Sequence, residues 1–302
     1  MSYSSSYDVI IIGGSYAGLS AAMALGRSLR NVLVVDSGKP CNRYVTHAHN
    51  LVTQDGKTPT EITESILEQI AQYSTVKILK GKAIKGERGD GGFEIEIEDG
   101  SRFFGLKLLF ATGKKDLMPD IAGFGDCWGK SIAQCPYCHG YEARDTETGI
   151  LSNGDSAFEL ARIIYNWSKK LTVFTNGPSS ISADFVNRLE VKNIKVVEKE
   201  IIAIEHVDGM MKRIVFGDGT SSALETLYNH AHSVQHCDIP AQMGCEITEH
   251  GLIKVDECQL TTVPGIFAAG DNSYVFRALS VAIAAGTKAG ALINKELVED
   301  SF

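Results

Sequence analysis

The start of the chain consists of two short apolar runs separated by a glycine-containing turn and a helical apolar pattern. Residues 8–12 and 32–35 are rich in Val, Ile and Leu, as strands buried on both faces of a sheet are. Between them, Leu19, Met23 and Leu25 continue a pattern that predicts a helix. A strand, a turn, a helix and a second strand predict a βαβ unit that opens a parallel sheet.

A further helix and then a series of strands follow this unit. Thr58 and Glu61 have the spacing of a capping box, and Pro59 suits the first position of a helix. Across 93–98 the pattern changes, because apolar residues alternate with glutamates and Asp-Gly at 99–100 supplies a tight turn. The sequence therefore predicts a β-meander after the βαβ unit.

The same order of patterns then recurs. Residues 149–151 predict a strand, 152–154 a turn and 171–174 a second strand, with a helical apolar pattern between the turn and the second strand. Two Asp-Gly turns later mark a second meander. The last stretch, 265–294, returns to a strand, a turn and a long helix. We expect an α/β fold of two Rossmann-like domains, each a parallel sheet with a β-meander, the second inserted into the first. The predicted boundaries are 1–114 with 240–302 for the first domain and 115–239 for the second.

Composition narrows the function classes. The chain has 302 residues, 44% of them apolar and 22% charged, with a formal net charge of −8. An acidic chain without blocks of like charge favours neither nucleic acid nor a membrane surface as a partner. The N-terminal MSYSSSYD lacks the basic region of a secretory signal, and no apolar run reaches the ~18 residues of a membrane span. We expect a cytoplasmic protein, in which the seven cysteines are mostly reduced.

The first turn has the spacing of a dinucleotide-binding motif. Gly13 and Gly18 occupy the outer glycine positions of GxGxxG, and Ser15 replaces the middle glycine, where backbone approaches a pyrophosphate. Asp36 ends the second strand, close to the distance of about 20 residues at which an acid binds a ribose hydroxyl. The alternative is a tight turn beside an unpaired surface aspartate.

Two more turns follow buried strands of the same domain. Thr112 and Gly113 follow one strand, and Gly270 and Asp271 follow another. Ligands bind open α/β sheets at the carboxyl ends of their strands. Each turn alone is a weak signal, but together they predict one FAD site, in which the helix start at Gly18 takes the pyrophosphate and Asp271 takes a polyol hydroxyl.

Cys135 and Cys138 lie in the stretch CPYCHG. Two thiols at this spacing can close and reopen a disulfide ring, and so store two electrons. Half of a zinc site, with His139 as a third ligand, is the alternative. Zinc would require a second pair of ligands, and the other cysteines are isolated. We expect them to be small buried apolar residues, although Cys41 lies in the loop on the FAD side and could be reactive if exposed. The isolated cysteines are Cys41, Cys127, Cys237, Cys245 and Cys258.

These motifs, in this order, resemble the low-molecular-weight thioredoxin reductase family over nearly the whole chain. The resemblance implies that Cys135 meets the substrate, that Cys138 faces the flavin, and that the protein is a homodimer. It also implies a set of residues that touch FAD: Gly13, Gly18, Asp36, Asn50, Gly113 and Asp271.

His139 departs from the family pattern, which usually has an aspartate after the cysteine pair. An imidazole titrates near neutral pH and can accept and return a thiol proton, so His139 is the candidate general acid/base. The alternative is a histidine whose hydrogen bonds are satisfied beside a turn. The remaining histidines that cluster in sequence are expected to be loop residues with a minor chance of lining the site: His47, His49, His230, His232 and His236.

The second domain lacks features that NADPH needs. Its turn begins with Ser152 where a first glycine is expected, although Gly154 and Ala157 remain. The strand that should end in a basic cluster for a 2′-phosphate ends in FTNGP at 174–178. NADPH binding is therefore doubtful. In this respect the chain looks more like relatives that work without nicotinamide, the gliotoxin-type dithiol oxidases and the ferredoxin-dependent flavin thioredoxin reductases.

The expected function is that of an FAD-dependent thiol-disulfide oxidoreductase. Its substrate would be a small dithiol or disulfide, or a thioredoxin-like protein, and its terminal partner oxygen, ferredoxin or NADPH. The alternatives are an NADPH-dependent thioredoxin-disulfide reductase and a non-catalytic flavin-binding sensor with structural cysteines.

Overall fold

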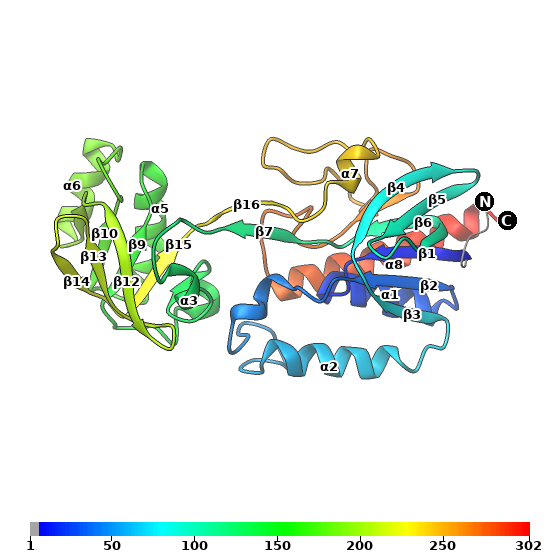
Figure 1. Ribbon diagram of the computed structural model, residues 1–302, viewed down its shortest axis with the longest axis horizontal. Coiled ribbons are helices and arrows are strands. Elements are labelled where there is room, and N and C mark those ends of the chain that lie inside the picture. Colours follow the sequence, from blue (N-terminus) through cyan, green and yellow to red (C-terminus); the bar gives the residue numbers. More distant parts are fainter. Residues whose placement is uncertain (1–5) are drawn as a thin grey trace. The chain divides into compact units, whose positions relative to one another are not determined.

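The computed structural model describes residues 6–302, which form two compact units (Figure 1). Residues 1–5, on which the expectation about a secretory signal partly rests, lie outside the described residues. Unit 1 contains the residues up to Arg43, Thr60–Lys115 and Ser233–Phe302, and unit 2 contains Tyr44–Pro59 and Asp116–His232. By contacts, therefore, the segment 44–59 belongs with the second unit, whereas the predicted boundaries place it in the first. The ligand that each domain binds stays a prediction.

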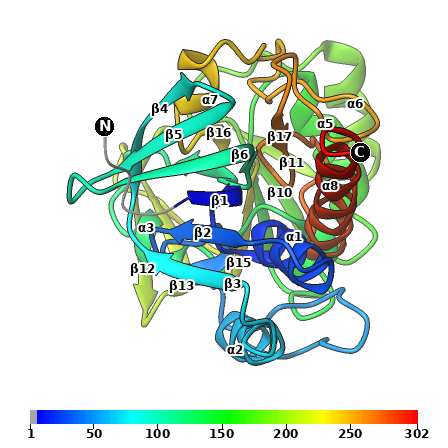
Figure 2. The same cartoon turned by 90° about the vertical axis from the view of Figure 1, so that its right-hand side faces the viewer.

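The main sheet of unit 1 joins a parallel part to an antiparallel part through one shared strand, β6 (Figure 2). The strand order is β3-β2-β1-β6-β5-β4, and β17 also pairs with β6. Ile10 in β1 lies opposite Leu33 on one side and Leu108 on the other, which explains why this strand is apolar throughout. The strands are β1 (Ser6–Ile12), β2 (Val32–Asp36), β3 (Val76–Lys80), β4 (Ala83–Gly89), β5 (Gly92–Ile97), β6 (Arg102–Phe110) and β17 (Ile266–Ala268).

The antiparallel part is the predicted meander. Phe93, Ile95 and Ile97 are buried in the same core cluster as residues of the parallel strands. Arg102 on the neighbouring strand forms ion pairs with Glu94 at 3.1 Å and Glu96 at 2.8 Å. The alternation of apolar and acidic residues in the sequence thus corresponds to a buried face and a face of paired charges.

Two helices of unit 1 that are far apart in sequence, α1 (Tyr16–Arg27) and α8 (Leu279–Glu299), pack side by side (Figure 2). Two glycines of α8 make this packing possible. A Cβ atom on Gly286 would lie 2.0 Å from the carbonyl oxygen of Ala17, and one on Gly290 would lie 2.7 Å from the carbonyl oxygen of Ala21. Small residues here let the last helix lie directly against the first. The helices of the unit are α1 (Tyr16–Arg27), the 3-10 helix η1 (Cys41–Tyr44), α2 (Pro59–Ile70), α7 (Ile239–Gln242) and α8 (Leu279–Glu299).

Unit 2 is built on a parallel sheet with the order β11-β10-β9-β15-β8. Successive residues of a strand contribute to different clusters: Ile150 belongs to the cluster under helices α5 and α6, and Leu151 to the cluster under the meander β12-β13-β14. The sheet therefore lies between two layers. The strands are β8 (Ile132–Ala133), β9 (Thr148–Leu151), β10 (Leu171–Phe174), β11 (Lys195–Val197), β12 (Ile201–Val207), β13 (Met210–Phe216), β14 (Ser221–Ala223) and β15 (Thr226–Asn229), and the helices are α3 (Phe124–Cys127), α4 (Pro136–His139), α5 (Asp155–Ile164) and α6 (Ala183–Val191).

Two further strands, β7 (Lys114–Leu117) and β16 (His232–Gln235), pair with each other where the chain passes from one unit to the other. The predicted α/β fold with two parallel sheets and two meanders is confirmed. Within residues 6–302, no helix combines the length and the apolar character that crossing a membrane demands. The cytoplasmic location stays a prediction.

Candidate active site

Cys135 and Cys138 are joined by a disulfide, with their Cα atoms 5.3 Å apart. Cys135 is the N-cap of the short helix α4, and Pro136 occupies the first helical position. The backbone N–H of Cys138 donates a hydrogen bond to the sulfur of Cys135 at 3.1 Å. Since a hydrogen bond to the charged form favours that form, this amide would stabilise a thiolate on Cys135 once the disulfide opens.

The helix that carries the cysteines rests on Trp167. The aromatic ring of Tyr137 meets the indole edge-on, with the ring centroids 5.5 Å apart. A Cβ atom on Gly140 would lie 2.4 Å from the carbonyl oxygen of Pro136 and 2.8 Å from the indole. Only glycine lets the chain turn this closely. The glycine of the CxxCHG pattern is therefore needed for packing, in addition to the two cysteines that are needed for the disulfide.

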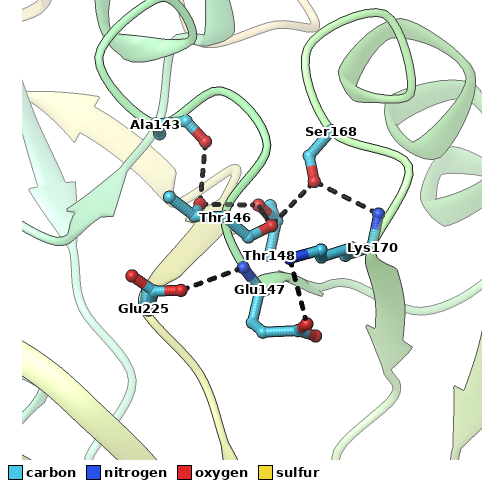
Figure 3. Close-up of polar contacts among 7 residues, drawn as sticks. All are labelled: Ala143, Thr146, Glu147, Thr148, Ser168, Lys170 and Glu225. Atoms are coloured by element: carbon cyan, nitrogen blue, oxygen red, sulfur yellow. Dashed lines mark hydrogen bonds and ion pairs between the residues drawn. The ribbon is translucent and has the colours of Figure 1, made fainter.

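A buried hydrogen-bond network holds the chain after α4 to the starts of two strands (Figure 3). The hydroxyl of Thr146 donates to the carbonyl oxygen of Ala143 at 2.7 Å, and that of Ser168 donates to the carbonyl oxygen of Thr146 at 2.7 Å. The backbone N–H of Lys170 donates to the hydroxyl of Ser168 at 3.2 Å. Ser168 is 1% exposed. The segment that carries the cysteines is therefore held to the sheet at both ends, by β8 before the cysteines and by these hydrogen bonds near the starts of β9 and β10 after them.

His139 is the last residue of α4, and both of its ring nitrogens are buried without a hydrogen-bond partner among the described residues. Burial lowers the pKa of His139. Two groups act in the opposite direction: the carbonyl of Cys135, which lies near the ring but outside hydrogen-bond geometry, and the carboxylate of Glu142. The imidazole is therefore neutral at neutral pH and able to accept a proton. For the alternative considered from the sequence, a histidine with satisfied nitrogens, the described residues offer no partner. The role of His139 as general acid/base stays a prediction.

His49 and Glu142 form a pair that the sequence did not single out. The Nε2 atom of His49 is 3.6 Å from Oε1 of Glu142, and its Nδ1 atom is 3.6 Å from Oδ2 of Asp55. Both His49 and Glu142 act electrostatically on His139. The contact joins segments far apart in sequence, so no local pattern could indicate it. The other clustered histidines are exposed: His47, His230, His232 and His236.

In unit 1 the glycine-containing turn follows β1 and forms a tight backbone cradle. Gly13 has φ +109°, and a Cβ atom there would lie 2.3 Å from the carbonyl oxygen of Ala111. A Cβ atom on Gly18 would lie 1.8 Å from the carbonyl oxygen of Gly13. Ser15 is the N-cap of α1, and its side chain forms no capping hydrogen bond. Glycine is thus required at both outer positions of the motif, because the turn is tight and the helix packs closely on the neighbouring backbone.

Asp36 ends β2 next to this cradle. One carboxylate oxygen accepts a hydrogen bond from the backbone N–H of Gly14 at 2.6 Å, and the other accepts one from Gly38 at 2.7 Å. The carboxylate therefore fixes the turn and retains lone pairs that a ribose hydroxyl could use.

Two other predicted turns lie at the carboxyl ends of β6 and β17, the same edge of the sheet. The buried side chain of Asn272 links them, because its Nδ2 atom donates to the carbonyl oxygen of Phe110 at 2.8 Å and to the hydroxyl of Thr112 at 3.4 Å. Asp271 accepts a hydrogen bond from Nε of Arg277 at 3.0 Å. The parallel strands thus bring together most of the predicted FAD residues: Gly13, Ser15, Gly18, Asp36, Thr112, Gly113, Gly270 and Asp271.

Asn50 stands apart from this group. It lies in the segment 44–59 of unit 2, with φ +61°, and its backbone N–H donates to the carboxylate of Asp55 at 2.7 Å. Its predicted contact with FAD stays a prediction.

The second glycine turn, at the start of α5, is filled by its own side chains. Oδ1 of Asn153 accepts hydrogen bonds from the backbone N–H of Gly154 and of Ser180, both at 2.8 Å. Its Nδ2 atom donates to the carbonyl oxygen of Pro178 at 2.9 Å. Asp155, the acidic residue in the first turn of α5, accepts from the backbone N–H of Ser182 at 2.9 Å. The loop after β10 is thereby fastened over the turn that would meet a pyrophosphate.

The single cysteines differ in exposure. Cys127 and Cys245 are buried, as predicted, and Cys237 is partly buried. Cys41 and Cys258 are exposed, so the expectation of buried cysteines is wrong for these two. Cys41 begins the 3-10 helix η1. Cys258 lies in a turn, where its backbone N–H donates to the carboxylate of Asp256 at 2.7 Å. Neither position faces a core.

Comparison with known proteins places the chain in a family. Residues 7–286 match the pyridine nucleotide-disulphide oxidoreductase family. The thioredoxin reductase tcpT of Claviceps purpurea is 33% identical over 99% of this chain and 97% of its own length, and the thioredoxin reductase aclD of Aspergillus oryzae is 30% identical over 97% of both. A crystal structure of an oxidoreductase from Agrobacterium tumefaciens is 35% identical, covers 97% of this chain and 99% of its own, and superimposes with a TM-score of 0.90. This membership implies a flavin cofactor, FAD. The chain belongs to the pyridine nucleotide-disulphide oxidoreductase family and is a thioredoxin reductase-like disulfide oxidoreductase of that family.

Proposed function

We propose that this protein passes an electron pair between a dithiol or disulfide substrate and FAD through Cys135 and Cys138, without a nicotinamide cofactor. The observation that carries the proposal is a closed disulfide followed directly by His139, whose buried nitrogens have no hydrogen-bond partner among the described residues.

The residues at the carboxyl edge of the first sheet fit FAD. The backbone cradle has room only for glycine at Gly13 and Gly18, and the buried Oδ1 atom of Asn272 has no partner among the described residues. Bound there, FAD would supply a two-electron acceptor or donor. The proposed holders are Gly13, Ser15, Gly18, Asp36, Asn50, Thr112, Gly113, Gly270 and Asp271.

The exchange itself needs only the substrate and residues of unit 2. His139 takes the proton of one substrate thiol, and the resulting thiolate attacks the sulfur of Cys135. A mixed disulfide forms as the bond to Cys138 breaks and leaves a thiolate there. His139 then gives its proton to the Cys138 thiolate and takes the proton of the second substrate thiol. The new thiolate attacks the substrate sulfur of the mixed disulfide, the bond to Cys135 breaks, and Cys135 leaves as a thiolate that His139 can protonate, so the substrate is released as a disulfide and the cysteine pair is reduced. The reverse sequence reduces a disulfide substrate.

Three features support independence from nicotinamide. The side chain of Asn153 occupies the backbone amides of Gly154 and Ser180, groups that a pyrophosphate would use. Asp155 adds a carboxylate to the first turn of α5, where it repels a phosphate. No arginine stands in the FTNGP stretch after β10 to bind a 2′-phosphate.

The substrate class follows from the relatives, which are named thioredoxin reductases. We propose a small dithiol or disulfide, or a thioredoxin-like protein, as substrate, and oxygen or ferredoxin ahead of NADPH as the terminal partner. A cytoplasmic homodimer remains the proposed form.

Anaerobic reduction of the purified holoenzyme tests the proposal. Excess dithiothreitol should bleach the flavin absorption band, whereas NADPH should leave it unchanged, and Cys138→Ser should abolish bleaching by the dithiol. Rapid bleaching by NADPH would establish the nicotinamide-dependent alternative. Unchanged dithiol bleaching in Cys138→Ser would remove the cysteine pair from the electron path.

A further inference from the structure

The turn after α4 places an acidic residue on the same side as His139. The backbone N–H of Ala143 donates to the carbonyl oxygen of His139 at 3.1 Å, so the helical turn continues past the end of α4. Glu142 follows His139 by three residues, a spacing that brings side chains together on a helical turn. The side chain of Glu142 is 48% exposed, whereas the ring nitrogens of His139 are buried. A half-exposed carboxylate thus lies one helical turn from a buried imidazole.

Glu142 pairs with one titratable side chain and acts electrostatically on two others. His49 lies 3.6 Å from it and 3.6 Å from Asp55, and so stands between two carboxylates. The buried phenol of Tyr228 has its pKa raised to about 12, mainly by burial and in addition by Glu142. Glu142 also raises the pKa of His139, against the larger effect of burial. These groups belong to a single unit of the fold.

We propose that Glu142 is a positioning residue that stabilises His139 in its protonated form during thiol-disulfide exchange, and that His49 competes with His139 for the same carboxylate. The inference rests on the proposed function, because it concerns the proton that His139 takes from a substrate thiol. That proton moves from the substrate sulfur to a ring nitrogen of His139. Glu142 forms no covalent bond and neutralises the charge that the transfer creates.

The charges that surround His139 determine the direction of the effect. Glu142 attracts the imidazolium, whereas a protonated His49 repels it; the carbonyl of Cys135 attracts it. Asp55 and Tyr228 act one step away, through their contacts with His49 and Glu142. Removal of the Glu142 charge should therefore lower the pKa of His139 further, and removal of His49 should raise it.

The test compares Glu142→Gln with Glu147→Gln in the holoenzyme. Glu147 is an exposed carboxylate of the same stretch, paired with Lys170 at 3.8 Å, and serves as the matched control (Figure 3). The rate of anaerobic flavin reduction by dithiothreitol is measured across pH. In Glu142→Gln the plateau should fall about ten-fold and the acid limb should move down by about one pH unit, as loss of an adjacent opposite charge requires. Glu147→Gln should match the unchanged protein.

A second variant should shift the pKa of His139 in the opposite direction. His49→Gln should move the acid limb up, because it removes the competitor for Glu142. Titration of the His139 imidazole by NMR in the oxidised enzyme should give the same two directions without any substrate. A profile and titration unchanged in Glu142→Gln, or equal shifts in Glu142→Gln and Glu147→Gln, would overturn the inference. If dithiols fail to reduce the unchanged enzyme, the proposed function fails, and the NMR titration still decides the coupling of Glu142 to His139.

Discussion

Gly140 and Trp167 are in such close contact that a Cβ atom on the glycine would lie 2.8 Å from two atoms of the indole. The backbone N–H of Asp145 also donates to the carbonyl oxygen of Trp167, at 3.1 Å. The turn after the cysteine pair therefore depends on the loop before β10 for both its packing and its hydrogen bonds. The position of the disulfide segment is therefore determined by this contact as well as by the short helix α4.

Gly140→Ala should destabilise the protein by about 1–3 kcal/mol, because the added methyl group overpacks a site that backbone and an indole enclose. Thermal or urea unfolding measures the change. Gly125→Ala is the matched control, since a Cβ atom on Gly125 meets no atom within 4 Å and the residue lies in α3. Equal stability of the two variants would show that the contact with Trp167 imposes no requirement for glycine.

Asn153→Ala should cost about 1 kcal/mol of stability, because two backbone N–H groups lose their acceptor. It should not create bleaching of the flavin by NADPH, since the substitution adds no basic residue near the turn. Both are measured on one preparation, by urea unfolding and by anaerobic absorption. Asn187→Ala, at an exposed position of α6, is the control for loss of an asparagine side chain. Fast reduction of the variant by NADPH would mean that Asn153 alone closes a competent nucleotide site.

The stability of the oxidised enzyme should fall as the pH drops from about 7 to about 5, in part because of His139. Burial lowers the pKa of His139 below its usual 6.5, so the unfolded chain binds a proton in this range before the folded one does. Protonation therefore favours the unfolded state, and the contribution of His139 is fully present only above the unfolded pKa. His139→Gln should lose less stability than the unchanged protein over the same interval, as measured by urea midpoints at both pH values. An identical loss would place the imidazole in solvent.

Local patterns determined which elements could be predicted. The strand at 171–174 was predicted with its observed bounds, because a buried strand of a parallel sheet is short, apolar and flanked by polar residues. The start of α2 at Pro59 followed from the capping pattern around it. The disulfide between Cys135 and Cys138 was expected from their spacing together with the isolation of the other cysteines, which disfavoured a zinc site.

Contacts between distant segments could not be predicted in this way. The approach of His49 to Glu142 depends on the path of the 44–59 segment, for which the sequence has no periodic pattern. The bonds that Asn153 makes to Pro178 and Ser180 depend on the conformation of two loops. Serine in place of the first glycine indicated a weakened nucleotide turn, but not that an asparagine side chain fills it.

The membership of 44–59 in unit 2 has a practical consequence for dissecting the protein. A fragment cut as one continuous piece, 116–232, would contain the disulfide, His139 and Glu142 but would lack His49 and Asp55. Such a truncated polypeptide would have an altered charge balance around the imidazole. A recombinant fragment that preserves the native acid-base chemistry must therefore contain residues 44–59 joined to residues 116–232.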